Sequence, residues 1–376
     1  MSSRIQYFPN LDALRFIAFL LVFNDHIDRI CPSLKFPFLP NSGQGVRFFF
    51  VLSGFLISYL LLNEKKSNQT IDLKTFYTKR ILRIWPVYFL TVFIGFSIAI
   101  SSNYFNPLSL PFGISIAPKY LIYYLLFLGN ICVYLYGSMN MIVSITWSIS
   151  IEEQFYIIAP LIFKFFNNKT LLRSIILIIL IAGYKIFQNR TDGFYIYYYS
   201  YCCFLELGMG CLLGYLTFNS NWLISNISTA SKLNIIIVYA LGILMLIIQK
   251  SVISRYGPIF HLVTNLINST FFGYIILEQN FATHSIGKLG KLKIMSYLGK
   301  ISYGLYCYHM IIIFLVGYLI NNYISNKFNI WQESMIYLIS LGLTILIASI
   351  SFKSFEKYFL GLRKIHIKKK HIHYAD

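Results

Sequence analysis

Residues 332–352 read QESMIYLISLGLTILIASISF, with Glu333 as the single charged residue among them. A helix rises about 1.5 Å per residue, so ~20 mostly apolar residues can cross the ~30 Å hydrocarbon core of a bilayer. Because the stretch is long and does not alternate between apolar and polar residues, it favours a helix over a barrel strand. It therefore predicts a transmembrane helix.

Ten further apolar blocks precede this one. They lie near residues 13–30, 46–62, 84–100, 120–136, 146–166, 171–187, 198–218, 233–249, 259–280 and 297–320. Of the 376 residues, 57% are apolar, 18% aromatic and 12% charged, and the mean hydropathy is +0.64. A soluble enzyme carries about one quarter charged residues, and a disordered chain has few apolar ones. The composition excludes both classes and predicts an all-α, polytopic membrane helical bundle.

Basic residues gather between the apolar blocks. The chain has 32 Lys and Arg against 13 Asp and Glu, a net charge of +19. Three lysine- and arginine-rich segments, at 64–83, 288–300 and 363–370, should be cytoplasmic, because cytoplasmic loops collect such residues. With a cytoplasmic N-terminus, ten membrane spans place all three basic segments on the cytoplasmic side, whereas eleven spans do not. This distribution also makes a nucleic-acid partner the weaker interpretation of the net charge.

Of the eleven apolar blocks, the one at 120–136 is the least suited to span the membrane. It contains Gly129 and Asn130, and we expect it to be re-entrant or to lie along the surface. Irregular backbone at membrane depth survives only where protein or water covers it, so the segment would line a cavity. The chain is then one membrane-embedded domain over 1–362, followed by a basic cytoplasmic tail over 363–376.

Several other kinds of site are not expected. Asp12 and Arg15 interrupt the first apolar block, so a cleavable signal peptide is not predicted. The histidines of the tail favour an interfacial anchor over a metal site. The six cysteines form no CxxC pair and should be small core residues, with no metal site and no disulfide framework. They are Cys31, Cys132, Cys202, Cys203, Cys211 and Cys307.

Ionisable residues inside apolar blocks are energetically costly, and each is a candidate for function. Arg15 and His26 are eleven residues apart, about three helical turns plus ~20°, so they share a face roughly 16 Å apart along the axis. Under the predicted topology Arg15 lies near the cytoplasmic edge and His26 in the outer half. A snorkelling arginine and a hydrogen-bonded core histidine would explain the two residues equally well.

Two further motifs carry charge. In FYTKRILRIWP (76–86), Arg80 and Arg83 project the same way and could grip a phosphate, although positive-inside anchoring also explains such a pair. In WSISIEEQFY (147–156), Glu152 and Glu153 cannot both face lipid. A carboxylate there could orient the imidazole of His26, and the alternative is an acid favoured by the helix dipole.

Small residues mark two helix contacts. In GQGVRFFFVLSGF (43–55) the glycines allow close helix approach, and Ser53 could hydrogen-bond across helices. Ser53 is not in a GxSxG elbow, so a serine nucleophile is disfavoured. Gly210 and Gly214 form a GxxxG pattern of the same kind. Three ionisable residues in or beside apolar blocks are expected to be satisfied interior groups: Glu206, His261 and Glu278.

In their order along the chain, these motifs resemble the acyltransferase-3 family of bacterial membrane proteins. The matching stretches are LDALR (11–15) followed by His26, GVRFFFVLSGF (45–55), RILR (80–83), WSISIEEQFY (147–156), ISYGLYCYH (301–309) and FKSFEK (352–357). The resemblance implies about ten helices in the bacterial inner membrane. It also implies transfer of an acyl group, usually acetyl from acetyl-CoA, to a hydroxyl of a cell-envelope glycan or other sugar.

The resemblance also assigns residues. The arginine and histidine of the family's first motif match Arg15 and His26, its RxxR pair matches Arg80 and Arg83, and its carboxylate matches Glu152 in preference to Glu153. Our hypothesis makes His26 the general base, Glu152 its orienting group, and the arginines the ligands of the acetyl-CoA phosphates. The residues expected to support the substrate or the oxyanion are Ser53, Trp147, Glu153, Tyr303 and His309, with a backbone N–H of 120–136 as a further oxyanion donor.

The implied partners are acyl-CoA, a glycan or lipid-linked sugar acceptor and membrane lipid, with neither metal nor nucleic acid. A multi-span transporter or flippase is the main alternative, because ten helices with buried charges also describe that class. No inverted repeat or paired broken helices favour it. A structural or sensing protein would leave Arg15, His26 and Glu152 without a purpose.

Overall fold

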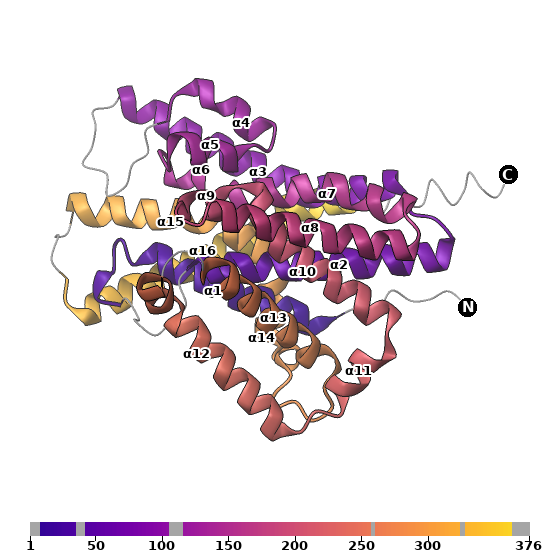
Figure 1. The fold of residues 1–376 in the computed structure, drawn as a ribbon. Coiled ribbons are helices and arrows are strands. Elements are labelled where there is room, and N and C mark those ends of the chain that lie inside the picture. Colours follow the sequence, from indigo (N-terminus) through magenta and orange to yellow (C-terminus); the bar gives the residue numbers. More distant parts are fainter. Residues whose placement is uncertain (1–7, 35–41, 105–115, 257–259, 324–327, 363–376) are drawn as a thin grey trace. The chain divides into compact units, whose positions relative to one another are not determined.

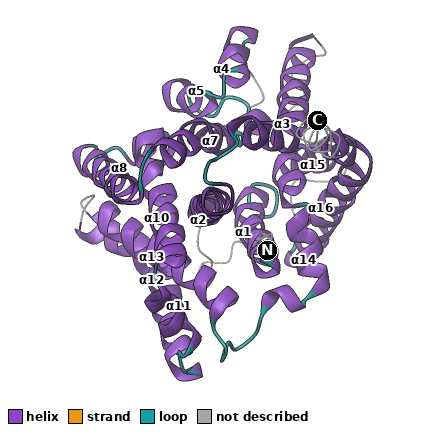
Figure 2. Cartoon of the chain, turned by 90° about the vertical axis from the view of Figure 1, so that its right-hand side faces the viewer, coloured by secondary structure: helices purple, strands orange, loops and turns teal. Residues whose placement is uncertain are grey.

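The computed structural model describes residues 8–34, 42–104, 116–256, 260–323 and 328–362. Over these ranges the chain is built from helices joined by loops and turns, and no strand is present (Figure 2). The tail over 363–376, with the histidines of the expected anchor, lies outside the described residues, as does the stretch 105–115. The predicted all-α class is confirmed.

Eight described helices are long and apolar enough to cross a membrane. They are α2 (Ser42–Asn68), α3 (Leu73–Tyr104), α8 (Asn168–Gln188), α10 (Ser200–Asn219), α12 (Lys232–Tyr256), α13 (Phe260–Phe281), α15 (Ser302–Tyr323) and α16 (Ile330–Ser351), the last continued by the π turn η4 (Phe352–Glu356). Two more, α1 (Pro9–Ile27) and α7 (Trp147–Phe165), have 19 residues each and hold acids and bases that make them less apolar. These ten helices correspond to the ten apolar blocks that remain after the block at 120–136 is removed from the predicted spans.

The segment at 120–136 is not a continuous helix. It consists of η2 (Pro118–Tyr120), α4 (Leu121–Leu125) and α5 (Gly129–Tyr136), each too short to cross a membrane. Phe127 joins α4 to α5 with a positive φ of 54°, which is strained for a bulky side chain. Its ring packs 4.5 Å from that of Tyr88 and 5.4 Å from that of Trp85, and this packing stabilises the break.

The remaining elements are short. They are η1 (Pro32–Leu34), α6 (Met141–Ser144), α9 (Gly193–Tyr198), α11 (Asn221–Ser228), η3 (Leu289–Lys291) and α14 (Lys293–Lys300). Local sequence sets several helix starts, since Asn side chains accept hydrogen bonds from the first free N–H groups. Asn167 caps α8 in this way, and Asn329 forms a reciprocal capping box with Gln332 at the start of α16.

The chain forms two compact units. The first unit comprises Met1–Val22, Pro37–Ile71 and Ile158–Lys300, and the second comprises Phe23–Phe36, Asp72–Ile157 and Ile301–Asp376. Each unit therefore combines segments that are distant in sequence, and each is described below by itself.

The first unit is centred on α2 and α10, which pack against each other (Figure 1). A Cβ atom at Gly210 would collide with the backbone carbonyl of Val51, and one at Gly54 with that of Leu207. The close helix approach expected from these glycines is confirmed, including the Gly210/Gly214 pattern. Lys65, near the end of α2, donates to backbone carbonyls of Phe163, Lys164 and Phe166, where α7 ends and its last carbonyls lack helical partners.

In the second unit, α15 packs against α16 and α3. The hydroxyl of Tyr303 donates to the carbonyl of Ile84 at 2.8 Å, and the thiol of Cys307 lies against Thr91. Ile84 and then Thr91 on α3 face Tyr303 and then Cys307 on α15. Because the two contacts follow the same order along both helices, α3 and α15 run parallel. All six cysteines of the chain are buried, which confirms them as core residues.

Candidate active site

His26 and His309 form a hydrogen-bonded pair in the second unit. His26 Nδ1 lies 2.9 Å from His309 Nε2, although the two residues are 283 positions apart in sequence. His309 is fully buried on α15, while His26, at the end of α1, is partly exposed. Among the residues that the structure describes, none is a hydrogen-bond partner for His26 Nε2. His26 Nδ1 thus faces the buried His309, and the other nitrogen of the His26 ring, Nε2, is left for a further partner.

The end of α1 is held against α16 by polar contacts on both sides of His26. Asn24 accepts a hydrogen bond of 2.6 Å from the hydroxyl of Tyr337, whose ring also packs edge-on against Phe23. After the helix ends, the backbone N–H and hydroxyl of Ser33 donate to the Glu333 carboxylate at 2.7 and 2.9 Å. These contacts restrict the position of the His26 backbone.

His309 is connected in turn to the tryptophan-containing motif of α7. Its Nδ1 lies 2.6 Å from the carbonyl oxygen of Tyr306, one turn earlier on α15. The Tyr306 hydroxyl donates to the carbonyl of Ile145 at 2.9 Å and lies 2.8 Å from the hydroxyl of Ser148. Trp147, adjacent to Ser148, is buried. The 147–156 motif therefore supports the histidine pair through Tyr306.

The two adjacent acids of α7 have different environments. Glu153 is 5% exposed and accepts a hydrogen bond of 2.9 Å from the indole N–H of Trp85 on α3. Glu152 is partly exposed and accepts from the hydroxyl of Tyr156 at 3.2 Å. We expected Glu152 to orient His26, but the hydrogen-bond partner of His26 is His309. The sequence could not separate these options, because Glu152 and His309 both lie on helices other than that of His26, and only helix packing decides which of them reaches it.

The RxxR pair lies on α3, where both side chains are partly buried. The guanidinium of Arg80 lies over the ring of Tyr156, 4.9 Å from its centroid, and 5.7 Å from that of Phe76. No described carboxylate lies within ion-pair distance of Arg80. Aromatic rings hold the plane of such a guanidinium without consuming its N–H groups, which stay available to an anion.

Arg83 lies one turn beyond Arg80 and close enough to interact electrostatically with Glu356, in the π turn η4. Glu356 is buried, and one of its carboxylate oxygens has no hydrogen-bond partner among the described residues. Tyr303, an expected oxyanion donor, uses its hydroxyl proton in the bond to Ile84. The backbone N–H of Gly129, in the broken segment, donates to the hydroxyl of Ser150 at 3.2 Å.

Two expected site residues belong to the first unit. Arg15 lies on α1, as does His26, and forms a 2.7 Å ion pair with Asp12, one turn earlier. Ser53 is partly buried on α2, next to the Gly54 contact. The structure thus brings together His26 and His309, and separately Arg80, Tyr156 and the acids of α7.

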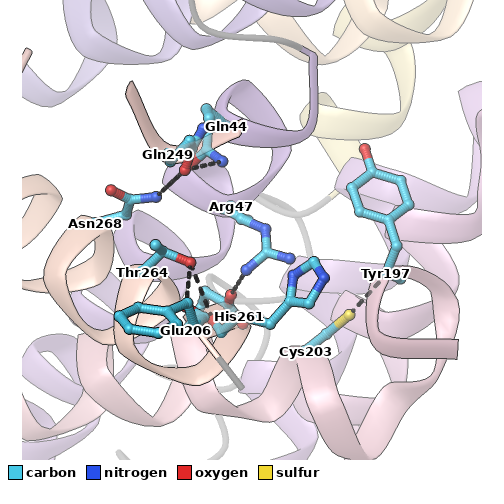
Figure 3. A network of polar contacts seen from close by, with 10 residues as sticks. Gln44, Arg47, Tyr197, Cys203, Glu206, Gln249, His261, Thr264 and Asn268 are labelled. Carbon is cyan, nitrogen blue, oxygen red and sulfur yellow. Dashed lines mark hydrogen bonds and ion pairs between the residues drawn. The ribbon is translucent and has the colours of Figure 1, made fainter. Parts of the chain in front are cut away.

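The first unit also contains a buried polar network (Figure 3). Arg47 on α2 and Glu206 on α10 form an ion pair of 2.6 Å, with the Glu206 side chain 3% exposed. Nearby, the side-chain amide of Asn268 donates to those of Gln249 and Gln44 at 2.7 and 3.2 Å. Glu206 is therefore a satisfied interior group, as expected.

The roles of three residues were not predicted from the sequence. Trp85, Tyr306 and Arg47 lie inside the motifs at 76–86, 301–309 and 43–55, but their hydrogen-bond partners Glu153, Ile145 and Glu206 lie far away in sequence. The available signals were the spacing of Trp85 from the RxxR pair and the i, i+3 spacing of Tyr306 and His309. Within the described ranges, no group of three or more His, Cys, Asp or Glu side chains is arranged to hold a metal ion.

The fold and the site define a multi-pass helical membrane protein in which His26 is hydrogen-bonded to the buried His309 and Arg80 lies over aromatic rings. The family comparison agrees with this class, because residues 8–353 match the acyltransferase-3 family model, which describes an acyltransferase domain. The chain belongs to that family.

Two relatives illustrate the similarity. The chain is 28% identical to the peptidoglycan O-acetyltransferase OatA of Listeria monocytogenes over 364 residues, which is 93% of this chain and 55% of the relative. It is 25% identical to the O-acetyltransferase OatA of Staphylococcus aureus over 93% of this chain and 57% of the relative. The chain thus spans somewhat more than half the length of these relatives. No solved structure matches it.

Proposed function

We propose that this chain is an O-acyltransferase domain that moves an acyl group from acyl-CoA to a hydroxyl of a cell-envelope glycan. Family membership supports the reaction class. The names of both relatives support acetyl as the acyl group, and the name of the Listeria relative supports peptidoglycan as the acceptor. A cytoplasmic N-terminus and C-terminus in the bacterial inner membrane would place acyl-CoA and the glycan on opposite sides of the bundle.

The observation that carries the proposal is the spacing of the arginine pair and the histidine pair along two parallel helices. Cys307 lies against Thr91, so His309, two residues further along α15, is roughly level with residue 93 of α3. Arg83 precedes that level by about ten residues, or roughly 15 Å of helix axis. Arg80 lies one turn further away.

This spacing suits an acyl-CoA molecule. The arm between the diphosphate and the sulfur of coenzyme A contains about 13 bonds, which extend to roughly 15 Å at the ~3.5 Å per three bonds of an extended chain. Diphosphate bound at Arg80 and Arg83 would therefore allow the thioester to reach the level of the histidine pair. Guanidinium groups suit this role because they bind phosphate oxygens bidentately.

In the proposed reaction His26 acts as general base. Its Nε2 takes the proton of the acceptor hydroxyl while the hydroxyl oxygen attacks the thioester carbonyl carbon. The C–S bond then breaks, and the proton passes to the thiolate, which leaves as free coenzyme A. Positioned proton transfer of this kind typically contributes 10²–10⁴-fold to a rate. Arg15, on the same helix as His26, is proposed to assist in holding the acyl donor.

The test uses the full chain in lipid nanodiscs with acetyl-CoA and soluble peptidoglycan fragments. Thiol release and product mass are measured for the unaltered protein, for His26→Ala and for the control His284→Ala, which alters an exposed histidine. We expect acetylated fragments from the unaltered and control proteins, and none from His26→Ala, which should still bind CoA. Acetylation by His26→Ala would overturn the base assignment, and a lack of thioester consumption by the unaltered protein would favour a transporter.

A further inference from the structure

We infer that His309 is a positioning residue that fixes the protonation pattern of His26, so that Nε2 of His26 is the basic atom and the second ring shares its charge. The inference rests on the proposed function for its catalytic meaning. The hydrogen-bond pattern itself is a property of the resting protein and can be tested separately.

The Tyr306 carbonyl fixes which nitrogen donates and which accepts in both hydrogen bonds of His309. The Tyr306 carbonyl oxygen has no proton to give, so the Nδ1 of His309, 2.6 Å away, must carry the hydrogen of that bond. A neutral imidazole has one N–H and one bare nitrogen, so Nε2 of His309 is the acceptor. The nitrogen facing it, His26 Nδ1, is therefore the donor, and the proton of neutral His26 lies there.

The geometry suits such a bond. The two ring planes differ by 19°, and their centroids are 5.1 Å apart, which is 2.2 Å more than the 2.9 Å between the nitrogens. That difference is about twice the distance from the centre of an imidazole to its nitrogen. The rings therefore meet end to end, and the in-plane lone pair of His309 Nε2 points at the N–H of His26.

Burial explains why the pair is neutral before the reaction. His309 is fully buried, and placing a charge on a buried ring is costly because the charge loses its hydration. Its ring also hydrogen-bonds to the backbone carbonyls of Tyr306 and Leu305. The carbonyls hold the proton on Nδ1 and exclude the opposite tautomer of His309.

The consequence for catalysis is an assignment of atoms. When His26 Nε2 accepts the hydroxyl proton, the new imidazolium keeps its Nδ1–H bond to His309, and the positive charge is shared along that bond. A buried carboxylate supplies this support in serine hydrolases. Here a second imidazole, oriented by the Tyr306 carbonyl, would do so.

The spectroscopic test uses ¹⁵N-histidine-labelled full-length protein in lipid bilayers, with the His26 and His309 signals assigned from single variants. Solid-state NMR at neutral pH should find a proton on Nδ1 and a bare Nε2 in both rings. A proton on Nε2 of His26 in the resting protein would overturn the inference. This result does not depend on whether the protein transfers acyl groups.

The kinetic test compares His309→Leu with His309→Gln, whose side-chain oxygen can replace the Nε2 acceptor. We expect kcat to fall about 10²-fold or more for His309→Leu, with KM for acetyl-CoA within about threefold, and we expect His309→Gln to recover activity to within about tenfold of the unaltered protein. The control is His284→Gln. Full activity of His309→Leu would overturn the inference, and if either variant fails to fold, the NMR result on the unaltered protein decides.

Discussion

The indole N–H of Trp85 donates a 2.9 Å hydrogen bond to Glu153, while the neighbouring Glu152 accepts from Tyr156 on its own helix. Adjacent residues on a helix point about 100° apart, so two acids that are indistinguishable in sequence face different surroundings. Glu153 links α7 to α3, and Glu152 lies on a partly exposed face. These contacts predict different consequences of mutation.

Replacing Glu153 by alanine should lower the free energy of unfolding by about 1–3 kcal/mol, because the N–H of Trp85 loses its acceptor in a largely buried position. Glu153→Gln retains an acceptor oxygen and should cost less. Glu152→Ala removes a partly exposed contact and is the matched control. Thermal unfolding in detergent micelles measures all three, and equal losses for Glu152→Ala and Glu153→Ala would contradict the distinction.

Arg80→Ala should raise KM for acetyl-CoA by about 10–100-fold, which corresponds to the ~1.5–3 kcal/mol of a charge-assisted hydrogen bond, and should lower kcat less. Arg80→Lys keeps the charge but loses the planar fork over Tyr156, so it should recover only part of the binding. Isothermal titration calorimetry with CoA measures the dissociation constant directly. Arg173→Ala, at an exposed arginine of α8, is the control. Unchanged CoA affinity in Arg80→Ala would remove Arg80 from the phosphate site.

Gly210→Ala should destabilise the first unit by about 1–3 kcal/mol, because the added methyl group meets the backbone carbonyl of Val51 and the helices must separate. Gly342→Ala is the matched control, since a Cβ atom at Gly342 on α16 meets nothing within 4 Å. That substitution should be neutral or stabilising by up to ~1 kcal/mol, because alanine favours a helix more than glycine does. Unfolding midpoints in detergent compare the two, and the reverse order would contradict the packing argument.

The Arg47–Glu206 ion pair predicts a non-additive result. Removing either partner leaves a buried charge alone, so Arg47→Met and Glu206→Met should each cost about 3–5 kcal/mol. The double variant replaces both charges with apolar groups and should be close to the stability of the unaltered protein. A double-mutant cycle measures the coupling. Additive losses would show that the two side chains do not interact as a pair.

Much of the fold follows from local sequence. The length of each apolar block determines whether a helix can span a membrane, and this property needs no knowledge of neighbours. A break in 120–136 was also expected, from Gly129 and Asn130 in the apolar run, but it falls at Phe127, and Gly129 and Asn130 instead begin α5. The close approach at Gly210 and Gly214 was also predicted, since an absent side chain has an obvious steric effect.

The sequence by itself determined the helical membrane class, the residues that are chemically able to act, and the family they resemble. Tertiary structure alone decided which of them are partners: His26 with His309 across 283 positions, Trp85 with Glu153, and Arg47 with Glu206. The reason is physical. Helix formation and membrane insertion depend on consecutive residues, whereas a hydrogen bond depends on two side chains within about 3 Å, which only the packing of helices brings together.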